Sequence, residues 1–203
     1  MKRLSLAIVF ACCMLGVAAQ EGGFRVDYQG AKPTIKDFAL AYIASLITEA
    51  EECDAEGMSM YEDLQYDIAR QAKGLPLDAN TTLTIDMKNG FLVYEQEQDE
   101  RLRRIEMCYW NEADGKHKLF ANNRWSFENG KPLMGQYDVL DFYRYNNATE
   151  KMSWCETPGF DVEYHNKSYA LPRTGKNITV TTWEDNGKQT QKTLKWNGHG
   201  FNY

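Results

Sequence analysis

The sequence predicts an α+β fold, in which two N-terminal amphipathic helices pack on an antiparallel β-meander of about eight strands. Two observations support this prediction. Apolar residues recur with the helical period between residues 34 and 76, whereas from residue 80 onward they alternate with polar residues. The alternating segments are separated by short Asn-Gly or Asp-Gly turns, which force neighbouring strands to run antiparallel. We expect a twisted sheet or a partly closed barrel.

The amino terminus has the features of a secretory signal peptide, which we assign to residues 1–19. Lys2 and Arg3 form a basic start, an apolar run over residues 4–17 follows, and cleavage is predicted before Gln20. This run is shorter than the roughly 20 apolar residues that a membrane-spanning helix needs. We therefore predict an exported protein without a membrane span.

The helical part of the chain follows a predicted extended tether, residues 20–33, which is glycine-rich and has no periodicity. Two capping patterns mark the helix starts: Thr34 with Asp37, and Ser59 with Glu62. The second helix is expected to end at Gly74, before the helix breaker Pro76. The acidic connection over residues 49–57 lacks the ligand spacing of a calcium loop and is interpreted as a charged link between helices.

Residues 34–203 are predicted to form a single domain, with a helical hairpin over 34–76 and the β-meander over 80–203. The predicted strands cover residues 82–87, 91–96, 101–110, 116–121, 136–145, 151–155, 177–183 and 190–196. The expected core residues, with the apolar stripe of the first helix lying over them, are Leu140, Phe142, Ile178, Val180 and Leu194.

Charge and cysteine content limit the possible functions. Loss of Lys2 and Arg3 with the signal peptide leaves 21 basic and 29 acidic residues, a net charge of −8, which argues against nucleic acid as a partner. Three cysteines then remain, Cys53, Cys108 and Cys155, so one internal disulfide at most can form, and the sequence leaves the pair open.

A similar sequence pattern occurs three times: an aromatic residue ends one strand, and a lysine begins the next strand after a polar turn. The three copies contain Trp110 with Lys116, Tyr145 with Lys151, and Trp183 with Lys188. We expect each aromatic residue to face its lysine across the first strand pair beside the turn. The same positions also suggest a platform for stacking sugar rings, with Trp110, Trp183 and Trp196 as candidate ligand-binding residues, although aromatic residues in a meander mostly pack in the core.

The sequence contains no motif of a known catalytic site. One carboxylate pair, Asp161 and Glu163, would share a strand face and could serve as acid and base in glycoside cleavage, but such pairs are common on solvated strands. The histidines His117, His165 and His199 are scattered over predicted turns and polar strands. We therefore predict no metal site and no cofactor.

Several segments resemble secreted proteins of gut-type Bacteroidetes bacteria of unassigned function: the AAQE junction, the PTIKDFALAYIASL helix, and the C-terminal LPRTGKNITVTTW and TLKWNGHGF. This resemblance implies a periplasmic or cell-surface location in a Gram-negative bacterium and supplies no catalytic residues. The resulting hypothesis is an exported, non-catalytic binding or envelope-associated protein, with a glycan or another envelope protein as partner. The alternatives are a carbohydrate-binding module that uses the hairpin-end tryptophans and a glycan-acting hydrolase that uses the carboxylate pair.

Overall fold

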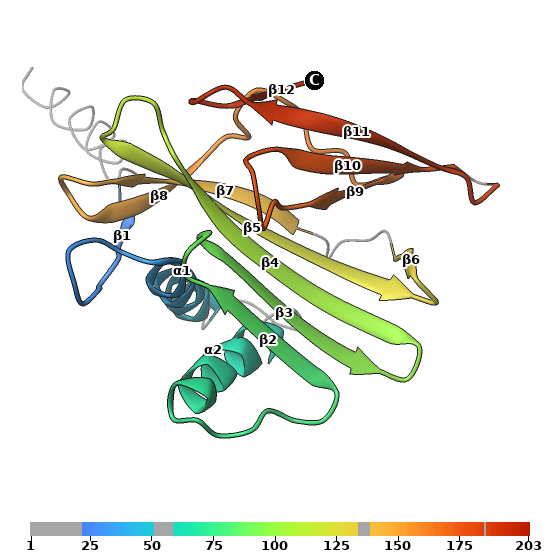
Figure 1. The fold of residues 1–203 in the computed structure, drawn as a ribbon, viewed down its shortest axis with the longest axis horizontal. Coiled ribbons are helices and arrows are strands. Elements are labelled where there is room, and N and C mark those ends of the chain that lie inside the picture. The colour runs from blue at the N-terminus through green and yellow to red at the C-terminus, as the bar shows by residue number, and fades with distance from the viewer. Residues whose placement is uncertain (1–21, 51–58, 134–138, 185) are drawn as a thin grey trace, which may run out of the picture.

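The computed structural model describes residues 22–50, 59–133, 139–184 and 186–203. They form two N-terminal helices, an eight-stranded antiparallel sheet and a four-stranded antiparallel sheet (Figure 1). The predicted α+β class is confirmed, and the large sheet is open rather than closed into a barrel. The predicted signal peptide and most of the acidic helix connection lie outside the described residues.

The two sheets differ in size and together contain twelve strands. The helices are α1 (Ile35–Ala50) and α2 (Ser59–Ala72). The large sheet contains β1 (Phe24–Arg25), β2 (Thr81–Asp86), β3 (Phe91–Gln98), β4 (Arg101–Asn111), β5 (His117–Glu128), β6 (Lys131–Pro132), β7 (Val139–Asn146) and β8 (Lys151–Cys155). The small sheet contains β9 (Lys167–Ala170), β10 (Ile178–Trp183), β11 (Gln189–Trp196) and β12 (Phe201–Asn202). The large sheet has the order β1-β8-β7-β5-β4-β3-β2, with β6 paired to β5, and the small sheet has the order β12-β11-β10-β9.

Local signals in the sequence set the helix boundaries. The Asp37 carboxylate accepts hydrogen bonds from the backbone N–H of Thr34 at 2.8 Å and from its hydroxyl at 2.6 Å, which satisfies groups that the start of α1 leaves unpaired. After α2, Gly74 adopts a φ of 69°, and the Leu75 N–H bonds back to the Arg70 carbonyl at 3.0 Å. This left-handed glycine ends the helix where the sequence predicts.

Part of the predicted tether belongs to the large sheet. Phe24 pairs with Met152, so that β1 forms an edge of the sheet beside β8. The next residue in the core, Val26, is 0% exposed, and its N–H donates to the Glu150 carbonyl at 3.0 Å. The prediction of an extended tether over residues 20–33 is therefore wrong for this short stretch, whose backbone is held by strand pairing.

The large sheet is covered on both faces. The helices lie on one face and the small sheet lies on the other, which gives three layers (Figure 1). The largest fully buried side chains between the helices and the large sheet are Phe38, Tyr42, Tyr94, Phe120 and Tyr145. Those between the two sheets are Trp125, Phe142 and Phe201. Each face of the large sheet therefore has its own apolar core.

The five predicted core residues are buried, but they lie in the core between the two sheets. The expectation that the first helix covers them is wrong, because α1 packs on the opposite face of the large sheet. The reason is the alternation of side chains along a strand. In β5, Phe120 faces the helices, whereas its neighbours Leu119 and Ala121 face the small sheet.

The predicted pairing of aromatic residues with lysines beside the turns is also wrong. Trp110 pairs with Leu119, Tyr145 with Met152, and Trp183 with Gln189. Each lysine falls at least one position nearer the turn than this pairing requires. The Lys188 carbonyl, for example, accepts a hydrogen bond at 2.9 Å from the N–H of Glu184, the residue that follows Trp183. The repeated pattern therefore marks hairpins in which these aromatic residues and lysines are not paired across the strands. In the first hairpin a different lysine, Lys118, contacts an aromatic residue, with its ammonium group 5.2 Å from the centre of the Tyr109 ring.

A buried carboxylate, Glu106, joins the two sheets. It lies in the middle of β4, is 7% exposed, and accepts a hydrogen bond from the backbone N–H of Leu171 at 2.9 Å. The Asn123 amide donates to the same carboxylate oxygen at 3.1 Å and to the Tyr169 carbonyl at 2.9 Å. These bonds hold the end of β9 and the residue that follows it against the large sheet.

Burial raises the pKa of Glu106 above its ordinary value of 4.5, although the hydrogen bond from Leu171 and the charge of Arg104 act in the opposite direction. The folded protein thus keeps a proton on Glu106 at pH values where the unfolded chain has lost it. As the pH rises from 4.5 through the raised pKa, the free energy of unfolding decreases by the contribution of this group.

We predict that Glu106→Gln removes this contribution, because the amide oxygen still accepts both hydrogen bonds and carries no charge. The stability of the variant relative to wild type should rise over the pH range above 4.5 in which wild-type Glu106 loses its proton, measured by urea denaturation. The control Glu97→Gln, at an exposed carboxylate of the adjacent strand β3, should leave the pH profile unchanged. A constant difference between Glu106→Gln and wild type across this range would contradict the prediction.

Candidate functional site

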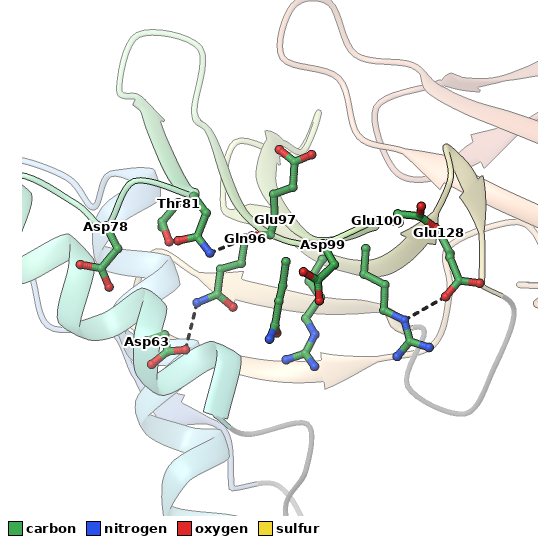
Figure 2. A pocket seen from close by; sticks show the side chains of 12 residues that line it. Asp63, Asp78, Thr81, Gln96, Glu97, Asp99, Glu100 and Glu128 are labelled. Carbon is green, nitrogen blue, oxygen red and sulfur yellow. Dashed lines mark hydrogen bonds and ion pairs between the residues drawn. The ribbon is translucent and has the colours of Figure 1, made fainter.

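A hollow of about 710 Å³ lies at the end of the large sheet where β3 turns into β4 (Figure 2). All twelve of its lining residues are polar or charged. Six carry carboxylates: Asp63, Asp78, Glu97, Asp99, Glu100 and Glu128. Two others, Arg101 and Arg103, carry guanidinium groups. We call this site the polar hollow.

The floor of the polar hollow is a part of the large sheet that extends beyond the helices. Tyr94 and Ile105 pair across β3 and β4 and are buried against the helices. Side chains alternate along a strand, so Gln96 and Arg103, two positions further along, lie on the same face. Arg103 is exposed, which shows that the helical layer no longer covers the sheet there.

Hydrogen bonds hold the two ends of the polar hollow. At one end, Gln96 reaches from the sheet and donates to the Asp63 carboxylate of α2 at 3.0 Å. At the other end, Arg101 donates to Glu128 across the β4–β5 pair at 3.0 Å (Figure 2). The hollow is thereby bounded by the helix on one side and by paired strands on the other.

The electrostatic character of the polar hollow is negative. The carboxylates of Glu97, Asp99 and Glu100 make no hydrogen bond or ion pair with any described residue. All three lie at or beside the β3–β4 turn, where Asp99 has a φ of 54°. The Glu97 side chain points to the opposite face of the sheet from Gln96 (Figure 2). Because the five other carboxylates outnumber the two guanidinium groups, the hollow favours positively charged, hydrogen-bonding ligands.

A second group of polar side chains lies at the opposite end of β4. We call Glu112, Asp114, His117 and His199 the carboxylate–histidine cluster. Glu112, Asp114 and His117 each offer one ligating atom, and these three atoms lie within 4.8 Å of one another. The His117 ring contacts the Asp114 carboxylate at 2.5 Å, and the His199 ring lies 4.0 Å from the Glu112 carboxylate. The fold thus brings two of the three histidines to one buried carboxylate.

Two turns from different sheets form this cluster. Glu112 and Asp114 belong to the turn between β4 and β5, His117 is the first residue of β5, and His199 belongs to the turn between β11 and β12. The Ala113 N–H donates to the Gly198 carbonyl at 2.8 Å, which joins the turns. A side chain at position 198 would place its Cβ 3.0 Å from the Ala113 Cβ, and φ there is 103°, so this contact requires glycine.

Sequence reasoning missed the carboxylate–histidine cluster. The spacing E-x-D-x-x-H from Glu112 to His117 was an available signal, since a tight turn places these three side chains together. No pattern in the sequence predicted that His199 lies near Glu112, because this contact depends on the packing of the small sheet against the large one. His165 is exposed and lies outside the cluster.

The structure does not place the three candidate tryptophans on one exposed surface. Trp110 is 4% exposed, and its ring stacks on Trp196 at 5.8 Å and meets Phe201 at 5.1 Å. Its indole N–H donates to the Lys176 carbonyl at 2.8 Å. Trp183 lies apart from this group, half-buried, and donates to the Ser168 hydroxyl at 2.9 Å. Trp110 and Trp196 therefore contribute to the core between the sheets.

The carboxylate pair Asp161 and Glu163 lies in an irregular segment before β9, and both side chains are exposed. Glu163 pairs with Lys167, and neither residue of the pair lines the polar hollow. Cys108 and Cys155 are free thiols, the first buried and the second partly buried. Cys53, the third cysteine of the predicted exported chain, lies outside the described residues.

Comparisons of the chain with models of protein families, with curated proteins and with solved structures find no match. The resemblance to secreted Bacteroidetes proteins, and the location it implies, therefore stay predictions. Within the ranges that the structure describes, no helix has the length and apolar character needed to cross a membrane.

We predict that Trp110→Ala destabilises the fold by about 3–5 kcal/mol, because it leaves a cavity between the sheets and an unpaired carbonyl at Lys176. Trp154→Ala is a matched control, since Trp154 is 63% exposed on β8 and should change stability by less than about 0.5 kcal/mol. Chemical denaturation of both variants measures these changes. Equal stabilities of the two variants would show that Trp110 does not support the core.

Proposed function

We propose that the chain is an exported, non-catalytic binding protein, and that its polar hollow takes a positively charged segment of another envelope protein. The observation that supports this proposal is the excess of carboxylates in a hollow lined only by polar side chains. Lysine and arginine side chains of a partner would meet the carboxylates of Asp99 and Glu100, which have no partner among the described residues.

The expected affinity follows from ordinary magnitudes. An exposed ion pair contributes about 0.2–1 kcal/mol, so two such pairs give about 2 kcal/mol at most. Hydrogen bonds to the amides of Asn80, Gln96 and Gln98 add about 0.5–1.5 kcal/mol each. A dissociation constant of 1 mM corresponds to about 4.1 kcal/mol, so we expect a reversible complex in the range of about 0.1–1 mM at low salt.

The alternatives have less support from the geometry. A sugar-stacking site needs an exposed aromatic face, and no aromatic side chain lines the polar hollow. A hydrolase needs an acid and a base directed into a cleft. The pair Asp161 and Glu163 is exposed and lies outside the hollow.

The test is to titrate the purified exported protein into a fluorescein-labelled peptide of about ten residues that is rich in lysine and arginine. Fluorescence anisotropy of the peptide measures binding. We expect binding at about 20 mM salt and at least a tenfold weaker complex at about 500 mM, because salt screens exposed charges. The double variant Asp63→Asn/Asp99→Asn should weaken binding about three- to tenfold, since it removes two carboxylates from the hollow.

The matched control is Asp161→Asn/Glu163→Gln, which removes two exposed carboxylates outside the hollow and should leave peptide binding unchanged. An acidic peptide of equal length should not bind. If the two double variants weakened peptide binding equally, the effect would come from net charge alone. That result would contradict a binding site at the polar hollow. Binding to a glycan array without binding to the basic peptide would favour the carbohydrate-binding alternative.

A further inference from the structure

We propose that the carboxylate–histidine cluster binds one divalent transition-metal ion, with Zn²⁺ as the best-matched ion. Glu112, Asp114 and His117 would supply three ligands, and His199 would supply the fourth. This site is separate from the polar hollow and does not depend on the proposed function, because it lies at the other end of β4.

The distances within the cluster suit a metal site that closes around its ion. Zn²⁺ binds carboxylate oxygen and imidazole nitrogen at about 2.0–2.2 Å, so two ligand atoms of a tetrahedral site lie about 3.4 Å apart. The three ligand atoms lie within 4.8 Å of one another. A movement of about 1 Å brings them to bonding distance. The Asp114 and His117 side chains are partly exposed, at 32% and 28%, and can make this movement.

Glu112 provides the fixed side of the site. Its side chain is 5% exposed, and one carboxylate oxygen accepts a hydrogen bond from Arg144 at 2.7 Å. The other oxygen makes no hydrogen bond with a described residue and faces the His199 ring at 4.0 Å. An arginine on one oxygen orients the carboxylate and leaves the second oxygen available for an ion.

Asp114 is held in the cluster by backbone groups of its own turn and of the first residue of β5. The N–H groups of Lys116 and His117 bond to one oxygen, at 2.8 and 3.0 Å, and the other oxygen contacts the imidazole.

The ligand types select the class of metal. Mg²⁺ and Ca²⁺ prefer sites made of oxygen ligands alone, whereas a mixed set of two carboxylates and two imidazoles is typical of Zn²⁺ and its neighbours in the first transition row. With four protein ligands the site would be closed, which is typical of a structural ion. Such an ion would link the β4–β5 turn to the β11–β12 turn and so fasten the small sheet to the large one.

The test uses the untagged exported protein after treatment with a chelator, titrated with Zn²⁺ in competition with a chromophoric chelator. We expect one Zn²⁺ per chain, and a rise in melting temperature on addition of Zn²⁺ because the ion binds only the folded state. His117→Gln should weaken Zn²⁺ binding at least tenfold, and His199→Gln should weaken it less, since the His199 ring lies further away and is 65% exposed. The matched control is His165→Gln, which should bind Zn²⁺ as wild type does.

Co²⁺ provides a second measurement that does not depend on any variant. Bound in a four-ligand site, it should give the visible absorption bands of tetrahedral Co²⁺, and Zn²⁺ should displace it. The proposal is overturned if the wild-type protein binds no Zn²⁺ at concentrations up to about 1 mM. It is also overturned if a folded His117→Gln protein retains wild-type affinity, or if His165→Gln loses as much affinity as His117→Gln.

Discussion

The central strands of the large sheet are buried on both faces, and this constraint fixes where the helices and the small sheet lie. Asn122 and Asn123, neighbours in the middle of β5, illustrate this constraint because both are almost fully buried and point to opposite faces. Asn122 donates to the hydroxyls of Tyr61 at 2.8 Å and Tyr42 at 3.1 Å, which belong to the two helices. Asn123 donates to Glu106 and to the Tyr169 carbonyl, and so holds the small sheet. One dipeptide thus bonds to both covering layers.

Hydrogen bonds of this kind contribute about 0.5–1.5 kcal/mol each, which is small beside the burial of the aromatic cores. Their effect is on position, because leaving either amide N–H group without a partner would cost about 1–3 kcal/mol. The Asn122 Oδ1, in contrast, has no hydrogen-bond partner among the described residues. A shift of β5 by one residue would exchange the two asparagines between the layers and move Phe120 from the helical core to the other face. The register of the central strands is therefore fixed by both apolar and polar groups.

The sequence allowed prediction of those parts of the fold that local signals encode. The cap of α1 at Thr34 and the β2–β3 hairpin follow from residues close together in the chain. The division into two sheets could not be predicted, because the small sheet is held by contacts of large sequence separation, such as that between Glu106 and Leu171. The predicted end of the fourth strand at residue 121 was too early for the same reason: Asn122 and Asn123 look like loop residues but have distant partners.

The same limit applies to the candidate sites. Trp110 looked like a ligand platform because the sequence could not reveal the rings of Trp196 and Phe201 that cover it. The polar hollow and the carboxylate–histidine cluster lie beyond opposite ends of β4, which separates them by roughly 33 Å at 3.3 Å per residue. β4 pairs with β5 without interruption from Arg101 to Asn111, and the described residues include no hinge between the two ends. Since energetic coupling requires an element with two arrangements, the two sites should act independently.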